Sequence, residues 1–346
     1  MSENKKFRET FGKLLLERVI PEKLDINEKI ELITPLNEYV KKNIPKSFFR
    51  YRSFDNEGKN LNALRNNKMY FNTPNNFNDP HDCSVYIDYE KVKQEIKKID
   101  LIDMNKFINE NKNTKIYKDL FTREQRRKFS KNRIKLECLQ KIQDNLCLEI
   151  KEKMKFLSDY YRSIPKIACL TEKRDDSPMW AYYADSHKGF VIEYDVEDLS
   201  SEMKIEGEKV FINCYPIIYS DFRFDATESA VAFAKKMVFQ NFVGSLKCPS
   251  NPVELKDELF FIKANIFKHK DWHNEKEWRI WLNSKEIDIN FINIKPKAIY
   301  LGCKISKDNR DKIINIAKSI ECKEIYQMLE DNSSPTYKLK YEKIEK

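Results

Sequence analysis

Glycine is scarce in this chain, with only 6 among 346 residues. Neither G-x-G-x-x-G nor G-x-x-x-x-G-K-S/T occurs, which excludes the two common glycine-rich phosphate loops. A G-x-S-x-G elbow, the turn that exposes the serine of many hydrolases, is also missing. The sequence therefore argues against the most familiar nucleotide-binding and serine-hydrolase sites.

Paired cysteine motifs and long apolar runs are missing as well. The 8 cysteines include no C-x-x-C, and several lie inside apolar runs, as Cys169 does. Because scattered thiols in such runs are typical of reduced core cysteines, we expect a reducing, cytoplasmic compartment. No eighteen-residue apolar run and no recognisable signal peptide occur, so we expect no membrane partner.

The hydrophobic and aromatic content is sufficient for a folded protein with a packed core. Hydrophobic residues make up 41% of the chain and aromatic residues 12%, which is too rich for a disordered chain. The formal net charge of +9 permits a nucleic-acid or other anionic partner. A lysine-rich surface without such a partner accounts for the charge equally well.

The pattern along the chain predicts an α+β fold with one main core. Residues 1–45 are expected to form an N-terminal helical extension, residues 46–330 a catalytic-like domain, and residues 331–346 a polar tail. Within the domain, residues 89–163 are charged and helical in pattern, so we expect a helical insertion. The expected strands do not alternate strictly with helices, which disfavours a doubly wound parallel sheet.

The segment that ends in Trp278-Arg279-Ile280-Trp281-Leu282 is the most informative. Side chains of a strand alternate between two faces. Alternation predicts a core face with Trp278, Ile280 and Leu282, and it gathers charged groups on the other: Glu275, Glu277 and Arg279, together with Trp281. This second face is either a solvent-facing set of charge pairs or one wall of a cleft.

The residues around Arg50 show a similar alternation. A strand at 48–54 places Arg50 and Arg52 on one face and Tyr51 on the other. Two arginines bracketed by aromatic residues suit a phosphate or carboxylate, because the guanidinium fork donates two parallel hydrogen bonds. Internal pairing with Glu275 or Glu277 is the alternative explanation.

A third segment, around Trp180, predicts a short helix with an aromatic face. Trp180, Tyr183 and His187 recur at a spacing of three to four residues, and the helix is expected to end at a left-handed Gly189. An aromatic wall of this kind stacks on a planar ligand ring, although an aromatic stripe is more often part of a core.

Two other kinds of site are weaker in the sequence. His269 and His273 are four residues apart, and His81 and Cys83 lie close in sequence, but no glutamate follows His269 as in H-E-x-x-H. We therefore expect no metal. A basic run in the helical insertion is a candidate nucleic-acid contact or a solvated helix face: Arg126, Arg127, Lys128 and Lys131.

At these same residues the sequence resembles a prokaryotic family known as domain of unknown function 2971. The resemblance covers about residues 47–305 and keeps the order of its motifs. Those motifs include Phe49-Arg50-Tyr51-Arg52-Ser53, Phe77-Asn78-Asp79-Pro80, Met179-Trp180-Ala181-Tyr182-Tyr183, Glu275-Lys276-Glu277-Trp278-Arg279 and Ile299-Tyr300-Leu301-Gly302. The family name implies no activity.

The order of these segments is also similar to that of the ADP-ribosyltransferase superfamily. This resemblance implies an antiparallel or mixed β core and an enzyme that uses NAD to modify a macromolecular target, nucleic acid or protein. Arg50 would hold the ribose or phosphates of NAD, and Tyr183 or Trp180 would stack on nicotinamide. Glu277 would stabilise the oxocarbenium-like transition state and Glu275 would activate the acceptor. Four more residues complete the candidate NAD site: Tyr51, Arg52, His187 and Arg279.

Three functional hypotheses follow. The transferase hypothesis predicts that Arg50 and Arg52 face Glu275 and Glu277 across one cleft. A non-catalytic nucleic-acid-binding module would instead use the basic run of the helical insertion. An interaction protein in a phage-defence or toxin–antitoxin system is the third, and the transferase resemblance is what places the chain in that setting.

Overall fold

A nine-stranded mixed sheet forms the centre of the computed structural model, which describes residues 3–104, 106, 136–199, 202–205, 208–243, 257–283 and 289–344. The strand order is β13-β12-β11-β4-β1-β3-β9-β6-β5. In chain order the strands are β1 (Ser47–Arg52), β3 (Lys166–Thr171), β4 (Phe190–Asp195), β5 (Glu202–Ile205), β6 (Glu208–Pro216), β9 (Glu277–Asn283), β11 (Ala298–Leu301), β12 (Glu324–Glu330) and β13 (Leu339–Lys343).

Neighbouring strands of this sheet run antiparallel, except β11 and β12, which run parallel. The predicted α+β class with a mixed β core is therefore confirmed. The middle strands read as nearly continuous apolar sequence because both faces are covered: all four residues of β11 and the first five of β4 are buried.

Two further pairs of strands flank the main sheet. One joins β2 (Lys68–Tyr70) to β10 (Phe291–Asn293) in antiparallel fashion. The other joins β7 (Ile218–Ser220) to β8 (Phe267–His269) in parallel. The second pair matters for function, because the segments that follow its strands carry many of the polar groups described below.

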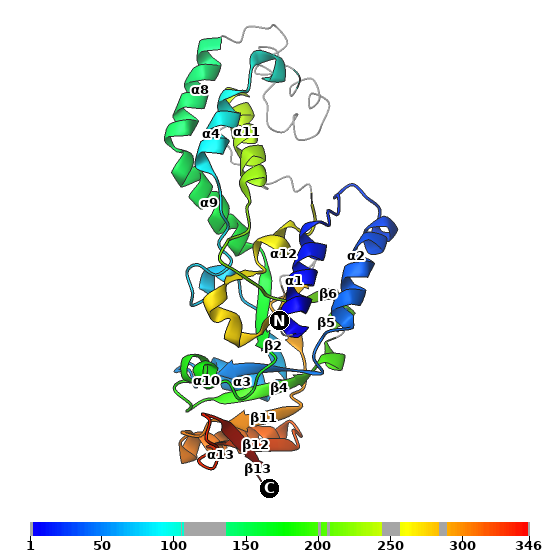
Figure 1. Ribbon diagram of the computed structural model, residues 1–346, viewed down its shortest axis with the longest axis vertical. Helices are drawn as coiled ribbons and strands as arrows, with labels where there is room; N and C mark the ends of the chain where they lie inside the picture. Colours follow the sequence, from blue (N-terminus) through cyan, green and yellow to red (C-terminus); the bar gives the residue numbers. More distant parts are fainter. Residues whose placement is uncertain are drawn as a thin grey trace.

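The N-terminal helices pack onto the main core. In α1 (Glu3–Leu16), the side chains of Phe11 and Leu15 are fully buried. In α2 (Ile26–Lys41), Leu36 is fully buried, and a capping box between Asp25 and Glu28 fixes the start of the helix. Both helices lie beside the sheet rather than apart from it (Figure 1).

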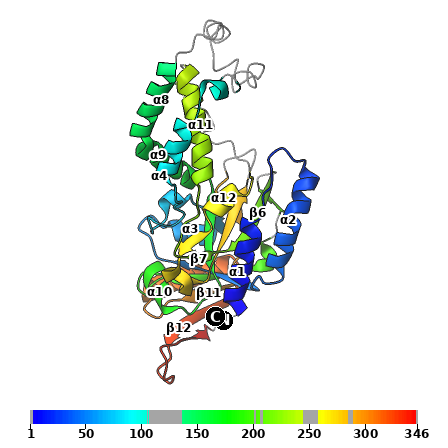
Figure 2. The same cartoon turned by 45° about the horizontal axis from the view of Figure 1, so that its top comes forward.

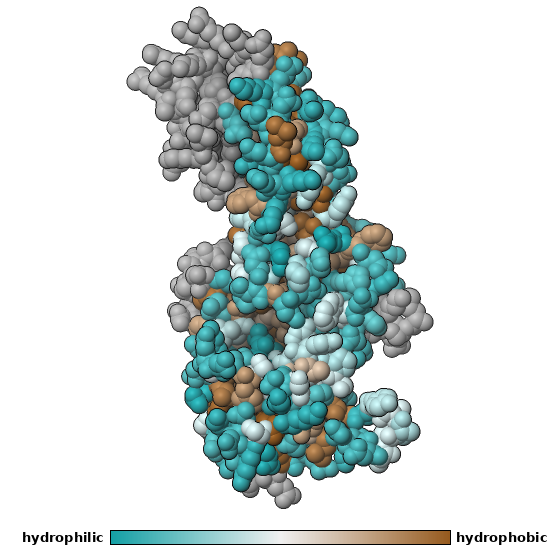
Figure 3. Space-filling view, turned by 90° about the vertical axis from the view of Figure 1, so that its left-hand side faces the viewer, coloured by the Kyte–Doolittle hydropathy of each residue, from teal (hydrophilic) through white to brown (hydrophobic). Residues whose placement is uncertain are grey.

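A second hydrophobic core holds together a separate group of helices at the far end of the long axis (Figures 1 and 2). Its helices are α4 (Tyr89–Lys97), α8 (Leu136–Leu148), α9 (Ile150–Ser163) and α11 (Thr227–Val243). Because α11 follows β7, this helical unit is built from two separated stretches of chain and extends beyond the expected insertion at 89–163. Its surface is largely hydrophilic in the view of Figure 3.

Short helices fill the remaining connections. These are α3 (Lys59–Arg65), η1 (Pro74–Asn76), α10 (Ser177–Tyr183), η2 (Val196–Asp198), α12 (Phe260–Ala264), η3 (Lys270–Glu275) and α13 (Lys307–Ser319). Within the described part of the chain, no helix is both long and apolar enough to cross a membrane.

The end of α10 differs from the prediction of a left-handed Gly189. The left-handed residues are instead Asp185, Ser186 and His187, with φ of 46°, 53° and 68°. Glycine is needed at 189 for another reason: a Cβ there would lie 2.1 Å from the carbonyl oxygen of Arg52. This close approach lets β4 pass directly beside the end of β1.

Candidate functional site

The register of the sheet decides which predicted site residues can meet. Thr171 of β3 is paired with Glu277 of β9 on one side and with Phe49 of β1 on the other. Directly paired residues share a face of a sheet, and neighbours along a strand alternate. Glu277 therefore shares a face with Phe49, while Arg50 and Arg52 point to the opposite face.

The prediction that Arg50 and Arg52 face Glu275 and Glu277 across one cleft is therefore wrong. Alternation within each strand was predicted correctly, since Arg50 shares a face with Arg52, and Glu277 with Arg279. The error lies in the relation between the strands. When two strands each carry a charged face, those faces lie on the same side of the sheet only if the pairing register places them there.

Around Glu277 the structure builds a buried charged cluster, defined by Asp82, Lys268, Glu275, Glu277 and Arg279. All five are at most 8% exposed. Glu277 accepts hydrogen bonds from Arg279 Nε at 2.7 Å and from Lys268 Nζ at 2.8 Å. Arg279 also donates from Nη2 to both carboxylate oxygens of Asp82 at 2.7 Å. Each ion of the cluster thus has a partner of opposite charge, as burial requires.

Glu275 links this cluster to the protein surface. One of its carboxylate oxygens accepts a hydrogen bond from Lys268, and the other accepts one from the hydroxyl of Tyr183 at 2.7 Å. Tyr183 lies at the end of α10 and is only half-buried. Of the predicted site residues, the structure thus brings together Glu275, Glu277, Arg279 and Tyr183.

The pKa values of the two glutamates in the cluster are shifted in opposite directions. Burial opposes ionisation of Glu277, but the charges of Arg279 and Lys268 outweigh it and hold its pKa well below the usual range. Burial raises the pKa of Glu275, although Lys268 acts in the opposite direction. Carboxyl groups separated in this way can divide the roles of fixed anion and proton carrier, with Glu275 as the carrier.

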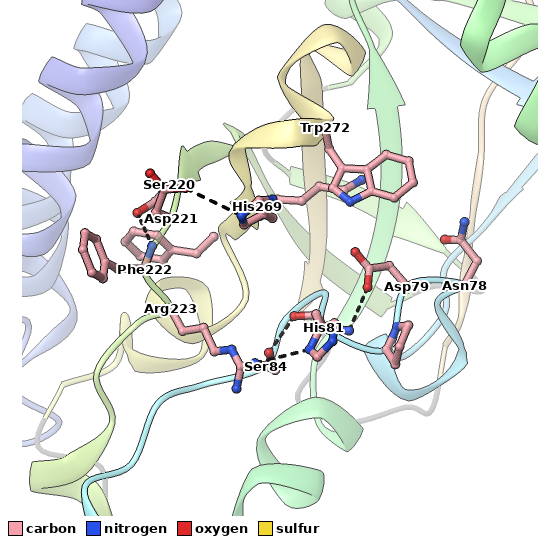
Figure 4. Close-up of a pocket in the computed structure, with 13 residues that line it drawn as sticks. Asn78, Asp79, His81, Ser84, Ser220, Asp221, Phe222, Arg223, His269 and Trp272 are labelled. Atoms are coloured by element: carbon pink, nitrogen blue, oxygen red, sulfur yellow. Dashed lines mark hydrogen bonds and ion pairs between the residues drawn. The ribbon is translucent and has the colours of Figure 1, made fainter.

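A pocket of about 610 Å³ opens beside the cluster, with Lys268 in its wall. Three stretches of chain contribute its lining: residues 78–81 with Ser84, residues 220–223 at the end of β7 and just after it, and residues 267–269 of β8 with Trp272 of η3. Figure 4 shows Trp272 and His269 on one side and His81, Ser84 and Arg223 on the other. The loop at 78–84 serves both places, since His81 lines the pocket while Asp82 reaches inward to Arg279.

The pocket wall carries an aromatic face and several polar groups. The Lys268 ammonium lies 5.1 Å from the ring centre of Trp272, and Tyr182 contacts the same ring edge-on. Arg223 Nη2 lies 3.3 Å from His81 Nδ1 (Figure 4). Asn78, also in the wall, lies near Tyr183, which is itself bonded to Glu275.

Three further predicted ligand contacts form an aromatic cluster of their own. Trp180 is fully buried, contacts Tyr51 edge-on at 5.3 Å between ring centres, and stacks on His187 at 6.1 Å. Burial and the lysine at 304 lower the pKa of His187. Trp180 therefore has no open face to offer a ligand, whereas Tyr183 contacts the charged cluster through Glu275.

The other predicted site residues lie away from the charged cluster or outside the described chain. The basic run Arg126, Arg127, Lys128 and Lys131 lies outside the described residues. His269 and His273 are exposed, and His269 lines the pocket, where it lies near Asp221. Among the described residues, no group of three or more potential ligands could hold a metal ion.

Sequence reasoning missed several members of the site. Asp82 follows a turn-rich stretch that gave no sign of the inward carboxylate, and Lys268 lies in an ordinary-looking short strand. Arg223 is one charged residue in a loop. One available signal was the count of charges near Glu277: two carboxylates and one arginine, once buried, need a further cation, which Lys268 supplies.

Comparison with known proteins gives one match. Residues 179–280 match the family model described as a protein of unknown function, DUF2971, which confirms the predicted family resemblance over this stretch. The stretch contains Tyr183, Arg223, Lys268, Glu275 and Glu277. No curated protein and no solved structure matches the chain. The similarity to ADP-ribosyltransferases stays a prediction.

Proposed function

We propose that the protein is an enzyme that binds a nucleotide-class ligand, with NAD as the candidate substrate, in the pocket beside the buried charged cluster. The observation that carries the proposal is this juxtaposition, since Lys268 lines the pocket and is bonded to Glu275 and Glu277. A volume of about 610 Å³ also falls within the usual range for small-molecule sites, about 300–1,000 Å³.

Three kinds of side chain in the pocket suit the three parts of a nucleotide. The indole of Trp272 offers a face for a planar ring. The carboxylates of Asp79 and Asp221 can accept hydrogen bonds from ribose hydroxyls, as acidic residues do in dinucleotide sites. The guanidinium of Arg223 can donate to phosphate oxygens. Neither Arg50 nor Arg52 has a part in this arrangement.

The cluster supports a reaction at the ribose. In transfer from NAD, the bond from ribose to nicotinamide breaks, nicotinamide leaves with the bonding pair, and positive charge develops on the sugar. The cluster holds three carboxylates against the two cations Lys268 and Arg279, so when all are ionised it carries one net negative charge. A fixed negative charge stabilises a cation that forms only in the transition state.

The acceptor, nucleic acid or protein, would then attack the ribose and lose a proton. We assign that proton to Glu275, reached through the hydroxyl of Tyr183, because the pKa of Glu275 is raised. Glu277 has a different role from the one implied by the resemblance. Both of its oxygens are already bonded within the cluster, so it positions Lys268 and Arg279 rather than touching the substrate.

The proposal is tested with NAD labelled in nicotinamide, by equilibrium dialysis and by release of the label. The chain is expected to bind NAD, and Trp272→Ala is expected to weaken binding by about tenfold or more through loss of ring stacking. Tyr183→Phe is expected to retain binding and slow the release. Arg65→Met, an exposed change on α3, is the control that leaves both unchanged.

The outcomes separate binding from chemistry. If neither NAD nor ADP-ribose binds at millimolar concentration, the pocket is not a nucleotide site and the proposal is wrong. If NAD binds but no nicotinamide is released with either a nucleic-acid or a protein acceptor present, the transferase step is wrong and nucleotide binding stands.

A further inference from the structure

Arg50 and Arg52 form a second polar site, on the face of the sheet opposite the charged cluster. Both project from β1 on the side of Phe48, whose ring contacts Trp278 at 5.3 Å. The β2–β10 pair lies next to these arginines. Arg50 Nη2 donates a hydrogen bond to the carbonyl oxygen of Tyr70, in β2, at 2.8 Å. The two arginines are half-buried, so solvent reaches them in part.

These arginines have no carboxylate partner among the described residues. Arg50 makes its one hydrogen bond to Tyr70, and its Nε is buried without any hydrogen-bond partner. Arg52 donates to the carbonyl oxygen of Tyr51 at 3.3 Å. Two groups raise the pKa of both arginines, the phenol of Tyr194 and the thiol of Cys169, and both are ordinarily neutral.

The environment of Arg50 and Arg52 disfavours their protonated, charged forms. Burial lowers the pKa of Arg50, and burial together with the charge of Arg50 lowers the pKa of Arg52 to about 9. Arg279, by contrast, is completely buried but keeps a raised pKa, because Asp82 and Glu277 outweigh the effect of burial. Two adjacent guanidinium groups without a counterion are a costly arrangement in a folded protein.

We infer that Arg50 and Arg52 form an oxyanion-binding site that takes inorganic phosphate or a phosphomonoester. A dianion supplies the negative charge that no carboxylate of the described residues provides, and its oxygens accept the parallel hydrogen bonds that guanidinium groups donate. The site lies across the sheet from the nucleotide pocket and does not depend on that proposal.

The test is the thermal unfolding of the full chain with increasing inorganic phosphate, at an ionic strength held constant with sodium chloride. A ligand that binds the folded state alone raises the unfolding temperature in proportion to the logarithm of its excess over Kd. We expect a rise of about 5 °C over a hundredfold excess of phosphate. Glycerol phosphate and succinate in parallel distinguish free phosphate, a phosphomonoester and a dicarboxylate.

Two variants locate the effect. Arg52→Met is expected to abolish the phosphate-dependent rise, whereas Trp272→Ala in the pocket is expected to retain it. Arg65→Met controls for the loss of one exposed positive charge. A response that is absent in the unsubstituted chain, or that survives Arg52→Met, overturns the site. A response that Trp272→Ala removes would place the anion in the pocket instead, which also overturns it.

Discussion

The two faces of the central sheet differ in the ion pairing of their arginine side chains. On one face, Arg279 is sealed from solvent and bonded to two carboxylates, Asp82 and Glu277. On the other, Arg50 and Arg52 lie side by side with no carboxylate partner within the described chain. Arginine in the same sheet is therefore an ion-paired internal group in one place and, in the described part of the chain, a group without a carboxylate partner in the other.

A charged strand face therefore does not by itself indicate a ligand site. A buried ion whose partners are all supplied by the protein is satisfied and has little left to offer a ligand. An ion that lacks a partner has its hydrogen-bonding capacity and charge available. On this criterion the Glu277 side contributes fixed charge, and we assign the proposed ligand contacts to the pocket wall and to the Arg50 side.

The largest expected effect is that of Arg279→Met. This change leaves the buried carboxylates of Asp82 and Glu277 without their main partner, so we expect a loss of about 3–5 kcal/mol in the free energy of unfolding. Urea denaturation at neutral pH measures it, with Arg65→Met as the exposed control within about 0.5 kcal/mol of the parent. A loss below about 1 kcal/mol would contradict the view that this arginine is a structural ion.

Glu277→Gln is expected to have a smaller but similar effect. The amide keeps the shape and one acceptor but not the charge, so the loss should be about 2–3 kcal/mol at neutral pH. The folded-state pKa of Glu277 is below its ordinary value of 4.5, so its contribution is present above pH 4.5 and disappears as the pH falls through the folded-state pKa. The difference between parent and variant should accordingly shrink in acid.

Equal losses at neutral and at strongly acidic pH would show that the effect of Glu277→Gln comes from packing rather than from charge. Glu277→Ala, which removes both, serves as the comparison and should cost more at every pH.

Arg52→Met is the matched test on the opposite face. Without phosphate, replacing an unpaired and partly buried cation by an apolar side chain of similar length should change the free energy of unfolding by less than about 1 kcal/mol, or increase it. Urea denaturation in phosphate-free buffer provides the value. A loss comparable to that of Arg279→Met would mean that Arg52 has an internal partner after all.

The smallest expected effect concerns His187 and pH. Burial lowers the pKa of His187 from its ordinary value of 6.5, so the folded state resists its protonation. The unfolded chain binds the proton more readily, and stability should therefore decline as the pH falls below about 6.5. His187→Gln should flatten the part of this decline between pH 7.5 and pH 5.5. An unchanged slope would show that other groups cause it.

Much of the fold was accessible from the sequence because it rests on local patterns. The alternation around Arg50 and Glu277, and the helical character of the described parts of residues 89–163, each follow from periodicity within one segment. The contribution of α11 to the helical unit was not accessible, since it depends on packing between segments about 70 residues apart or more. The left-handed run at Asp185 was not predicted either; in it the backbone N–H groups of Ser186 and His187 donate to carbonyl oxygens of α10.

The site was predictable only in part for the same reason. Glu275, Glu277, Arg279 and Tyr183 were identified and do meet. Lys268 and Asp82 complete the cluster from distant segments, and no local pattern marks them. The placement of Arg50 opposite Glu277 failed because the relative register of β1, β3 and β9 is a property of the assembled sheet.

The most direct test of the account is calorimetric titration of ADP-ribose into the parent chain, Trp272→Ala and Arg52→Met in phosphate-free buffer. ADP-ribose carries the base, ribose and phosphate groups that the pocket is proposed to hold. We predict that Trp272→Ala weakens its binding by about tenfold or more while Arg52→Met leaves it unchanged. Loss of binding in Arg52→Met with full retention in Trp272→Ala would contradict the assignment of the nucleotide to the pocket.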